Sequence, residues 1–252
     1  MFAALERGAC HLWHLSPLAL PNGDLVERGM AFLSTDESAR YARFLVPDAA
    51  RTFLSARVLL RSVLSAYGDL APAAWRFDTN PWGRPYIANA EAPARLEFNI
   101  SHKPGLVVCF VGYGRDLGVD VEDASAEPAY LDDIASRFFS PSEVAALLAL
   151  PQRERPKRFF QLWTLKESYI KARGMGLSLG LSGFSFTVDE PSATVRFEKD
   201  FADDPETWDF RLFRPDARHL IATSVRRSEL PLTIEIRDAE DLVARAVGLV
   251  SK

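Results

Sequence analysis

Residues 159–181, FFQLWTLKESYIKARGMGLSLGL, join a helical pattern to an unusual set of charged and aromatic side chains. Trp163, Glu167 and Lys171 are spaced by four residues, so on a helix they lie on one face. A Glu–Lys pair in this order stabilises an exposed helix by roughly 0.2–0.5 kcal/mol, which accounts for the spacing. It does not account for Trp163, for Lys166, or for the Gly-Met-Gly that follows. The segment is therefore either an ordinary amphipathic helix with a glycine stop or one half of an active site.

Helices and strands alternate in blocks on both sides of this segment. The N-terminal stretch CHLWHLSPL alternates like a strand, residues 34–68 have helical apolar spacing, and short strands are predicted at 96–101, 106–112 and 117–122. Further helical stretches lead into the segment, and several strand-like stretches follow it. The order strand, helices, strands thus occurs twice. This order predicts an α+β fold with two similar halves, residues 1–114 and 115–252.

The composition is that of a soluble globular protein. The chain has 252 residues, of which 48% are hydrophobic and 25% charged, so a substantial core can form. A net charge of −4 and a sequence pI of about 5.7 argue against a nucleic-acid partner, which would need a broad basic surface. The first residues do not resemble a signal peptide, and every apolar run is far shorter than the ~20 residues of a membrane span. With two distant cysteines the chain fits a cytoplasmic protein without a membrane partner.

The stretch GVDVED, residues 118–123, places two acids on one face of a predicted strand. Side chains alternate along a strand, so Asp120 and Glu122 point one way while the intervening valines point the other. Two neighbouring carboxylates repel each other unless a positive group lies between them. Mg²⁺ suits this position because it prefers oxygen ligands. The alternative is a solvated edge strand without a metal.

The stretch FNISHKP, residues 98–104, contains a further candidate group. Asn99 and Ser101 share one face of the predicted strand, and Ile100 and His102 share the other. His102 comes directly before a turn, where it is well placed to meet a phosphate or a nucleotide. A single histidine at such a position is also compatible with a structural or simply exposed side chain.

Taken in order, the segments WGRPYI, FNISHKPGLVV, LGVDVED, RFFSPSE and FFQLWTLKESYIKARGMGLSLGLSGFSF, with the helical RFLVPDAARTFLSARVLLRSVL, resemble a known family. They are similar to the 4′-phosphopantetheinyl transferases of the surfactin-synthetase-activating (Sfp) type. The resemblance implies two α+β halves related by a pseudo-twofold axis, with the active site in the cleft between them. It implies transfer of the phosphopantetheine arm of coenzyme A to a serine of an apo acyl or peptidyl carrier protein. Adenosine 3′,5′-bisphosphate is released, Mg²⁺ is required, and the enzyme is expected to be a monomer.

The resemblance also assigns roles to individual residues. Asp120, Glu122 and Glu167 match the family's metal ligands, and Lys171 matches a lysine that contacts the pyrophosphate and helps to activate the serine hydroxyl. Glu167 is our candidate for the base that takes the serine proton, directly or through a bound water, and the identity of that base stays open. The expected coenzyme A-binding residues are Arg40, Arg51, Arg84, Ser101, His102 and Lys171. Additional candidates are Trp163, Lys166, Glu143 and Lys103.

Two departures from the family pattern concern charge at the phosphate site. Lys103 stands where many relatives carry serine, and Glu37 stands where some carry a basic residue. Two other functions are alternatives. A Mg²⁺-dependent phosphohydrolase would use the same carboxylates but attack with water. A non-catalytic domain that binds a carrier protein is the other, and the intact acidic set argues against it. The first predicts cleavage of coenzyme A without a carrier, and the second predicts carrier binding without turnover.

Overall fold

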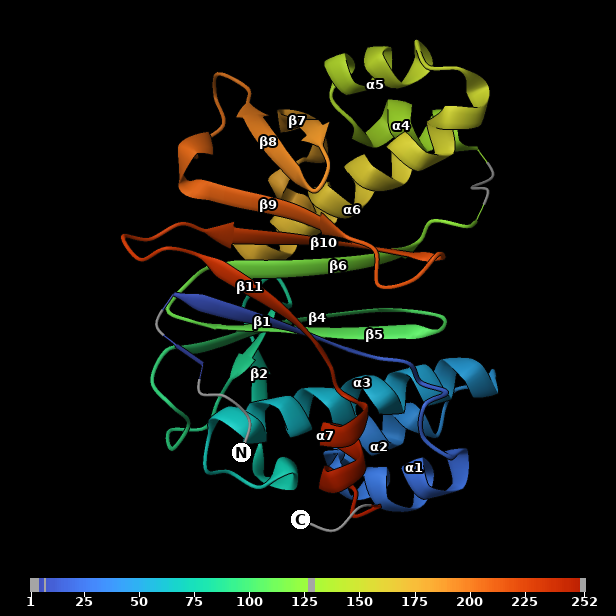
Figure 1. Ribbon diagram of the computed structural model, residues 1–252, viewed down its shortest axis with the longest axis vertical. Coiled ribbons are helices and arrows are strands. Elements are labelled where there is room, and N and C mark those ends of the chain that lie inside the picture. The colour runs from blue at the N-terminus through green and yellow to red at the C-terminus, as the bar shows by residue number, and fades with distance from the viewer. Residues whose placement is uncertain (1–4, 7, 127–129, 250–252) are drawn as a thin grey trace. The chain divides into compact units, whose positions relative to one another are not determined.

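The computed structural model describes residues 5–6, 8–126 and 130–249 (Figure 1). Helices and β-sheets both contribute to the core, so the predicted α+β class is confirmed. Contacts along the chain group the residues into two compact units. The first contains Met1–Asn80, Pro85–Gly114 and Leu230–Lys252, and the second contains Pro81–Arg84 and Arg115–Glu229.

The first unit is a four-stranded sheet covered by helices. Its strand order is β11 (Thr233–Asp238), β1 (Ala9–Leu15), β5 (Leu106–Tyr113) and β4 (Leu96–Lys103). Strands β1 and β11 are parallel, and the other pairs are antiparallel. The long helix α3 (Pro47–Tyr67) packs against the sheet, with α1 (Asn22–Gly29) and α7 (Glu240–Ala246) packed on α3 (Figure 1). This unit also contains α2 (Thr35–Tyr41) and a small ribbon of β2 (Phe77–Thr79) and β3 (Pro85–Ile87).

Local sequence explains where these helices begin and end. Pro47 occupies the first turn of α3, where a missing N–H costs nothing, and Gly68 follows its last residue. Helix α2 begins with a reciprocal capping box, in which Ser34 accepts from the backbone of Glu37 and the Glu37 carboxylate accepts from the backbone of Ser34. One face of α3 is buried against the sheet, as its apolar spacing predicts.

The second unit is a five-stranded antiparallel sheet. The strand order is β6 (Leu117–Asp123), β10 (His219–Arg226), β9 (Trp208–Phe213), β8 (Ser192–Phe197) and β7 (Phe184–Asp189). Helix α6 (Arg155–Arg173) lies against β6 and β10, and α4 (Leu131–Phe138) and α5 (Pro141–Leu148) pack on α6 (Figure 1). Helix α6 ends where the sequence predicts, because Gly174 adopts the left-handed conformation (φ 63°) that closes many helices.

The C-terminal segment belongs to the first unit, whereas the sequence predicts that residues 115–252 form the second half. Strand β11 pairs with β1 over six residues, and α7 packs against α3. This difference has a physical reason: the alternation of TIEIRD predicts a strand but carries no information on a pairing partner more than 200 residues away.

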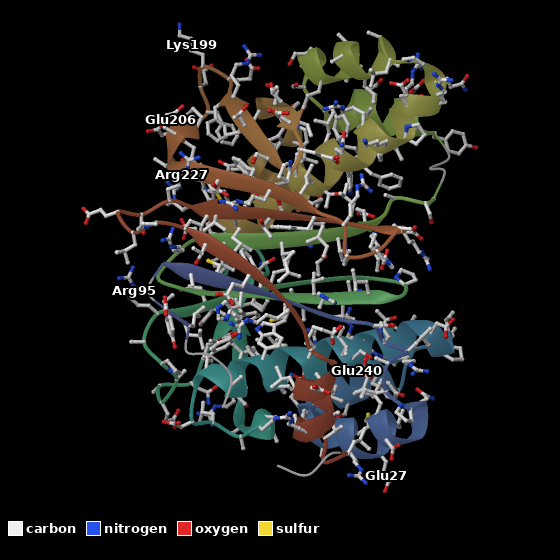
Figure 2. All side chains as sticks on the ribbon, in the orientation of Figure 1. Glu27, Arg95, Lys199, Glu206, Arg227 and Glu240 are labelled. Atoms are coloured by element: carbon white, nitrogen blue, oxygen red, sulfur yellow. The ribbon has the colours of Figure 1, made fainter. Side chains whose placement is uncertain are left out.

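Most charged side chains are exposed, as the composition leads one to expect. In the second unit, for example, Lys199, Glu206 and Arg227 are exposed at the surface (Figure 2). Buried charged side chains need a structural or functional explanation, because desolvation of an unpaired charge is costly. The second unit buries five such side chains: Arg115, Asp120, Glu122, Glu143 and Lys166. No helix in the described ranges is long and apolar enough to cross a membrane.

Candidate active site

The two acids of β6 point toward α6. Glu122 and Asp120 share a strand face with Gly118, whose partner in the register is Ser224 on β10. The hydroxyl of Ser224 forms a 2.6 Å hydrogen bond with that of Ser168 on α6, so this face of the sheet lies against the helix. Asp120 and Glu122 are only 5% and 8% exposed. The predicted shared face is confirmed. Strand β6 is the edge strand of its sheet, as the alternative supposed, but this face of it is buried rather than solvated.

Lys171 on α6 reaches this buried pair of acids. Its Nζ donates to Oδ1 of Asp120 at 2.6 Å. Glu167 lies one turn earlier on the same helix face and is half-buried. The strand and the helix therefore present three carboxylates and one ammonium group, which leaves an excess of negative charge when all are ionised. Such an excess suits a divalent cation or the positive groups of a ligand.

The chemistry of these donors fits Mg²⁺. All three candidate ligands are carboxylates, the hard oxygen donors that Mg²⁺ prefers, and neither thiol nor imidazole is among them. Over residues 5–6, 8–126 and 130–249, however, no group of three or more His, Cys, Asp or Glu side chains is arranged to hold a metal ion. Asp120 is instead held by Lys171. The three-carboxylate metal centre accordingly stays a prediction.

Arg84 binds the same helix and strand at their backbones. Its Nη1 donates to the carbonyl oxygen of Ala172 at 3.1 Å, and its Nη2 donates to that of Leu117 at 3.4 Å. Ala172 follows Lys171 in α6, and Leu117 is the first residue of β6. Arg84 thus joins the helix end that carries Lys171 to the strand that carries Asp120.

Comparison with known proteins gives matches over most of this chain. The model of the 4′-phosphopantetheinyl transferase superfamily matches residues 116–224, and that of the N-terminal part of 4′-phosphopantetheinyl transferases matches residues 21–112. A 4′-phosphopantetheinyl transferase of Bacillus subtilis is 32% identical over 219 residues, which is 86% of this chain and 92% of the relative. The chain belongs to the 4′-phosphopantetheinyl transferase superfamily.

Two further relatives support the Sfp-type resemblance of this transferase. The 4′-phosphopantetheinyl transferase HetI of Nostoc sp. is 39% identical over 168 residues, 67% of this chain and 70% of the relative. Sfp of Bacillus subtilis strain 168 is 37% identical over 164 residues, 65% of this chain and 70% of the relative. The predicted family and enzyme class are thus confirmed: the chain is a transferase of the class that moves the phosphopantetheine group from coenzyme A to carrier proteins.

Lys166, an additional candidate in the sequence, is a structural residue of the transferase. Its side chain is fully buried, and its Nζ donates to the carbonyl oxygens of Leu181 at 2.7 Å and Phe184 at 2.6 Å. The same Nζ lies 2.8 Å from the buried carboxylate of Glu143. Burial lowers the pKa of Lys166, and the Glu143 carboxylate opposes that shift. With three protein acceptors around it, the ammonium group is already committed to the core.

Glu143 also serves the fold. Its Oε2 accepts from the backbone N–H and the hydroxyl of Ser140, both at 2.9 Å, which caps helix α5. Its Oε1 accepts from the N–H of Phe186 on β7 at 2.9 Å. Trp163, in turn, packs in an aromatic cluster, stacked on Phe159 at 5.9 Å. These contacts assign packing roles to Glu143 and Trp163, which the sequence listed as site candidates.

In the first unit, Arg51 binds the loop before α1 rather than standing open to a ligand. Its Nε donates to the carbonyl oxygen of Pro17 and its Nη2 to that of Leu20, both at 2.6 Å. Arg40 is exposed, with its guanidinium 5.1 Å from the ring centre of Phe53. Glu37, a departure from the family, accepts hydrogen bonds from the Arg61 guanidinium at 2.6 and 3.3 Å. It thereby offsets positive charge near helix α2, which carries Arg40.

The residues of the NISH segment lie at the end of β4. Ser101 is buried on one face of the strand. His102 is exposed on the other face, which also carries Ile100, packed against the core of the first unit. Lys103 is half-buried and is the last residue of the strand. The alternation predicted from the sequence is therefore present, and His102 is the exposed member.

Asp203 is a residue that the sequence did not single out. It accepts hydrogen bonds from the Tyr169 hydroxyl at 2.7 Å and the Trp208 indole at 3.0 Å, and it pairs with Arg173. Tyr169 and Arg173 lie on the last turns of α6, so Asp203 fixes the helix end that bears Lys171. Asp203 follows β8 in a stretch without periodicity, and nothing in the local pattern distinguishes it from a solvated loop acid.

Proposed function

We propose that the transferase is Mg²⁺-dependent, and that Asp120, Glu122 and Glu167 hold the ion while coenzyme A reacts with a carrier serine. The observation that supports this proposal is the 2.6 Å contact between the Lys171 ammonium group and the buried Asp120 carboxylate, on the strand face that also bears Glu122. Buried carboxylates facing a lysine are suited to a substrate that carries phosphate charge. When bound, Mg²⁺ offsets charge on the diphosphate oxygens.

The chemistry at the reacting phosphorus is a substitution. The serine oxygen of the carrier forms a bond to the phosphorus that bears the pantetheine arm, and the bond from this phosphorus to the bridging oxygen of adenosine 3′,5′-bisphosphate breaks. The serine must lose a proton, because its hydroxyl is a poor nucleophile. Glu167 is the proposed acceptor. Lys171 supplies a positive charge beside the phosphates, and its contact with Asp120 orients the ammonium group.

Coenzyme A binding is proposed to use Arg84, Lys171, His102 and Arg40, with Ser101 and Lys103 as further contacts. Guanidinium groups bind phosphate in a bidentate manner. Arg51 is left out of this set because its Nε and Nη2 donate to backbone carbonyls at 2.6 Å, whereas the bonds of Arg84 to backbone carbonyls are longer, at 3.1 and 3.4 Å. We also propose that the partner is an apo acyl or peptidyl carrier protein, and that the enzyme acts as a monomer in the cytoplasm. Both cysteines are free and buried, which fits a reducing compartment.

The test is to incubate the protein with coenzyme A, Mg²⁺ and several apo acyl and peptidyl carriers, and to weigh each carrier by mass spectrometry. The expected result is a carrier heavier by one phosphopantetheine, with no product when EDTA removes the metal. Asp120→Ala and Glu167→Ala should abolish transfer while the melting temperature shows a folded protein. Asp123→Ala, which removes an acid next to Glu122 that pairs instead with Arg218, is the matched control and should stay active.

Three outcomes would contradict the proposal. An unmodified carrier together with cleaved coenzyme A would favour the phosphohydrolase. Carrier binding that survives Glu167→Ala, without any turnover, would favour the non-catalytic domain. Full activity of Asp120→Ala would refute the metal assignment even if transfer occurs.

A further inference from the structure

Strand β6 crosses helix α6 at unusually short range, and the closest point is Gly118. A Cβ atom built on Gly118 would lie 2.1 Å from the carbonyl oxygen of Ser168, 2.4 Å from the amide nitrogen of Ala172 and 3.0 Å from the Ala172 Cα. All three are backbone atoms of the helix. A change of side-chain rotamer cannot relieve such contacts, so any residue larger than glycine must separate the helix from the strand.

The conformation of Gly118 does not itself require glycine. The glycines with positive φ in the described residues include Gly114 and Gly174 but not Gly118. Space, rather than backbone freedom, is therefore the reason for glycine at this position. Replacing its hydrogen by a methyl group would demand a displacement of about 1.3 Å before the nearest contact reached an ordinary van der Waals distance.

The crossing lies between the two parts of the candidate site. On the strand, Gly118 shares a face with Asp120, two residues away. On the helix, Ser168 and Ala172 directly follow Glu167 and Lys171. The separation of the two backbones at Gly118 consequently determines whether the Lys171 Nζ can reach the Asp120 carboxylate at 2.6 Å.

We propose that Gly118 is a positioning residue for the transfer reaction. Its missing side chain lets β6 and α6 approach closely enough for Asp120 and Lys171 to meet, and it keeps Glu167 on the same side of that pair. The inference rests on the proposed function, because it assigns Gly118 to the site formed by these groups. A displacement of about 1 Å at reacting groups can lower a rate about 100-fold.

The test measures kcat and KM of the full chain with coenzyme A, Mg²⁺ and an apo carrier. Gly118→Ala is expected to lower kcat by about 10- to 100-fold. Asp120→Glu, which lengthens the acid by one methylene, is expected to lower kcat in the wild-type protein but to raise it in the Gly118→Ala background. This reversal of sign distinguishes positioning from a general loss of stability.

A second measurement does not depend on activity. In urea unfolding of the free protein, Lys171→Met should shift the midpoint in the wild-type background more than in Gly118→Ala, because the contact with Asp120 is already broken there. The control is Gly183→Ala, whose Cβ would meet the ring of Phe201 at 2.9 Å in the same unit. It is expected to lower stability and to leave kcat unchanged.

If Gly118→Ala does not fold, Ser224→Thr introduces one methyl group at the same crossing, next to the Ser168 hydroxyl. It should lower kcat in the same direction by a smaller factor. The inference would be overturned if Gly118→Ala had the kcat of the wild-type protein. If Gly118→Ala does not fold, the same result in Ser224→Thr would overturn it. A loss of kcat in Gly118→Ala that the added Asp120→Glu does not reverse would also overturn it. A wild-type protein that transfers nothing would instead refute the proposed function, so the two failures are distinguishable.

Discussion

The buried Lys166–Glu143 pair allows a quantitative test of whether Lys166 stabilises the fold or binds substrate. Lys166→Met keeps most of the length of the side chain but removes its charge and all its hydrogen bonds. The ammonium group has three acceptors within 2.6–2.8 Å, and none of its side chain is exposed. Removing one partner of a buried ion pair typically costs about 3–5 kcal/mol, because the other charge stays buried without compensation.

The structure places the expected loss at the lower end of this range. After Lys166→Met, the Glu143 carboxylate still accepts three hydrogen bonds, two from Ser140 and one from the N–H of Phe186. These donors continue to stabilise the anion. We therefore expect a loss of about 3 kcal/mol in the free energy of unfolding. The double variant Lys166→Met/Glu143→Gln should lose less than the sum of the two single variants, since it leaves no unpaired charge.

The measurement is urea unfolding at pH 7, followed by tryptophan fluorescence, combined with KM for coenzyme A. Lys157→Met is the matched control, because Lys157 is an exposed lysine on the same helix that lies 3.9 Å from Glu190. Its effect should stay within about 0.5 kcal/mol. A loss below about 1 kcal/mol in Lys166→Met, together with a raised KM for coenzyme A, would refute the structural role and return Lys166 to the substrate site.

Three further predictions concern the arginines and a buried histidine. Arg84→Ala should raise KM for coenzyme A, because a guanidinium beside Lys171 is lost; unchanged steady-state kinetics would contradict this role. Arg51→Ala should leave the KM for coenzyme A unchanged but lower the free energy of unfolding by about 2 kcal/mol, because two hydrogen bonds to the loop before α1 disappear. Urea denaturation and steady-state kinetics of the variant together test this prediction. Burial, with a contribution from Arg237, lowers the pKa of His11 from 6.5 to about 4, against the opposing charge of Glu235. Because the unfolded chain binds this proton first, stability should fall by about 2–3 kcal/mol as the pH drops from 6.5 to 4. His11→Asn, which retains a polar group near the Tyr67 hydroxyl, should flatten that dependence, and an unaltered slope in acid unfolding experiments would show that another group is responsible.

The features that the sequence predicts well are those determined by local periodicity. The alternation of GVDVED places Asp120 and Glu122 on one strand face, and the spacing of four places Glu167 and Lys171 on one helix face. In the structure Lys171 contacts Asp120. Such a contact is required if the strand and the helix form one active site. Periodicity suffices here because both segments are regular and directly adjacent in the fold.

The features that the sequence predicts poorly depend on burial and on distant partners. Lysine is among the residues least often buried, so nothing in WTLKES indicates that Lys166 lies in the core. The acceptors of Arg51 are backbone carbonyls, which every residue offers and no pattern marks. Gly118 did carry a signal, since a glycine inside a strand often marks a close approach of two backbones.

The parallel pairing of β1 with β11 has a consequence for the order of events during synthesis. The residues of the second unit all leave the ribosome before Thr233–Asp238, so that unit can complete its sheet while the first still lacks a strand. Until β11 arrives, β1 presents an open edge to other nascent chains. Loss of the last twenty residues would make that exposure permanent, and aggregation rather than lost chemistry is the expected result.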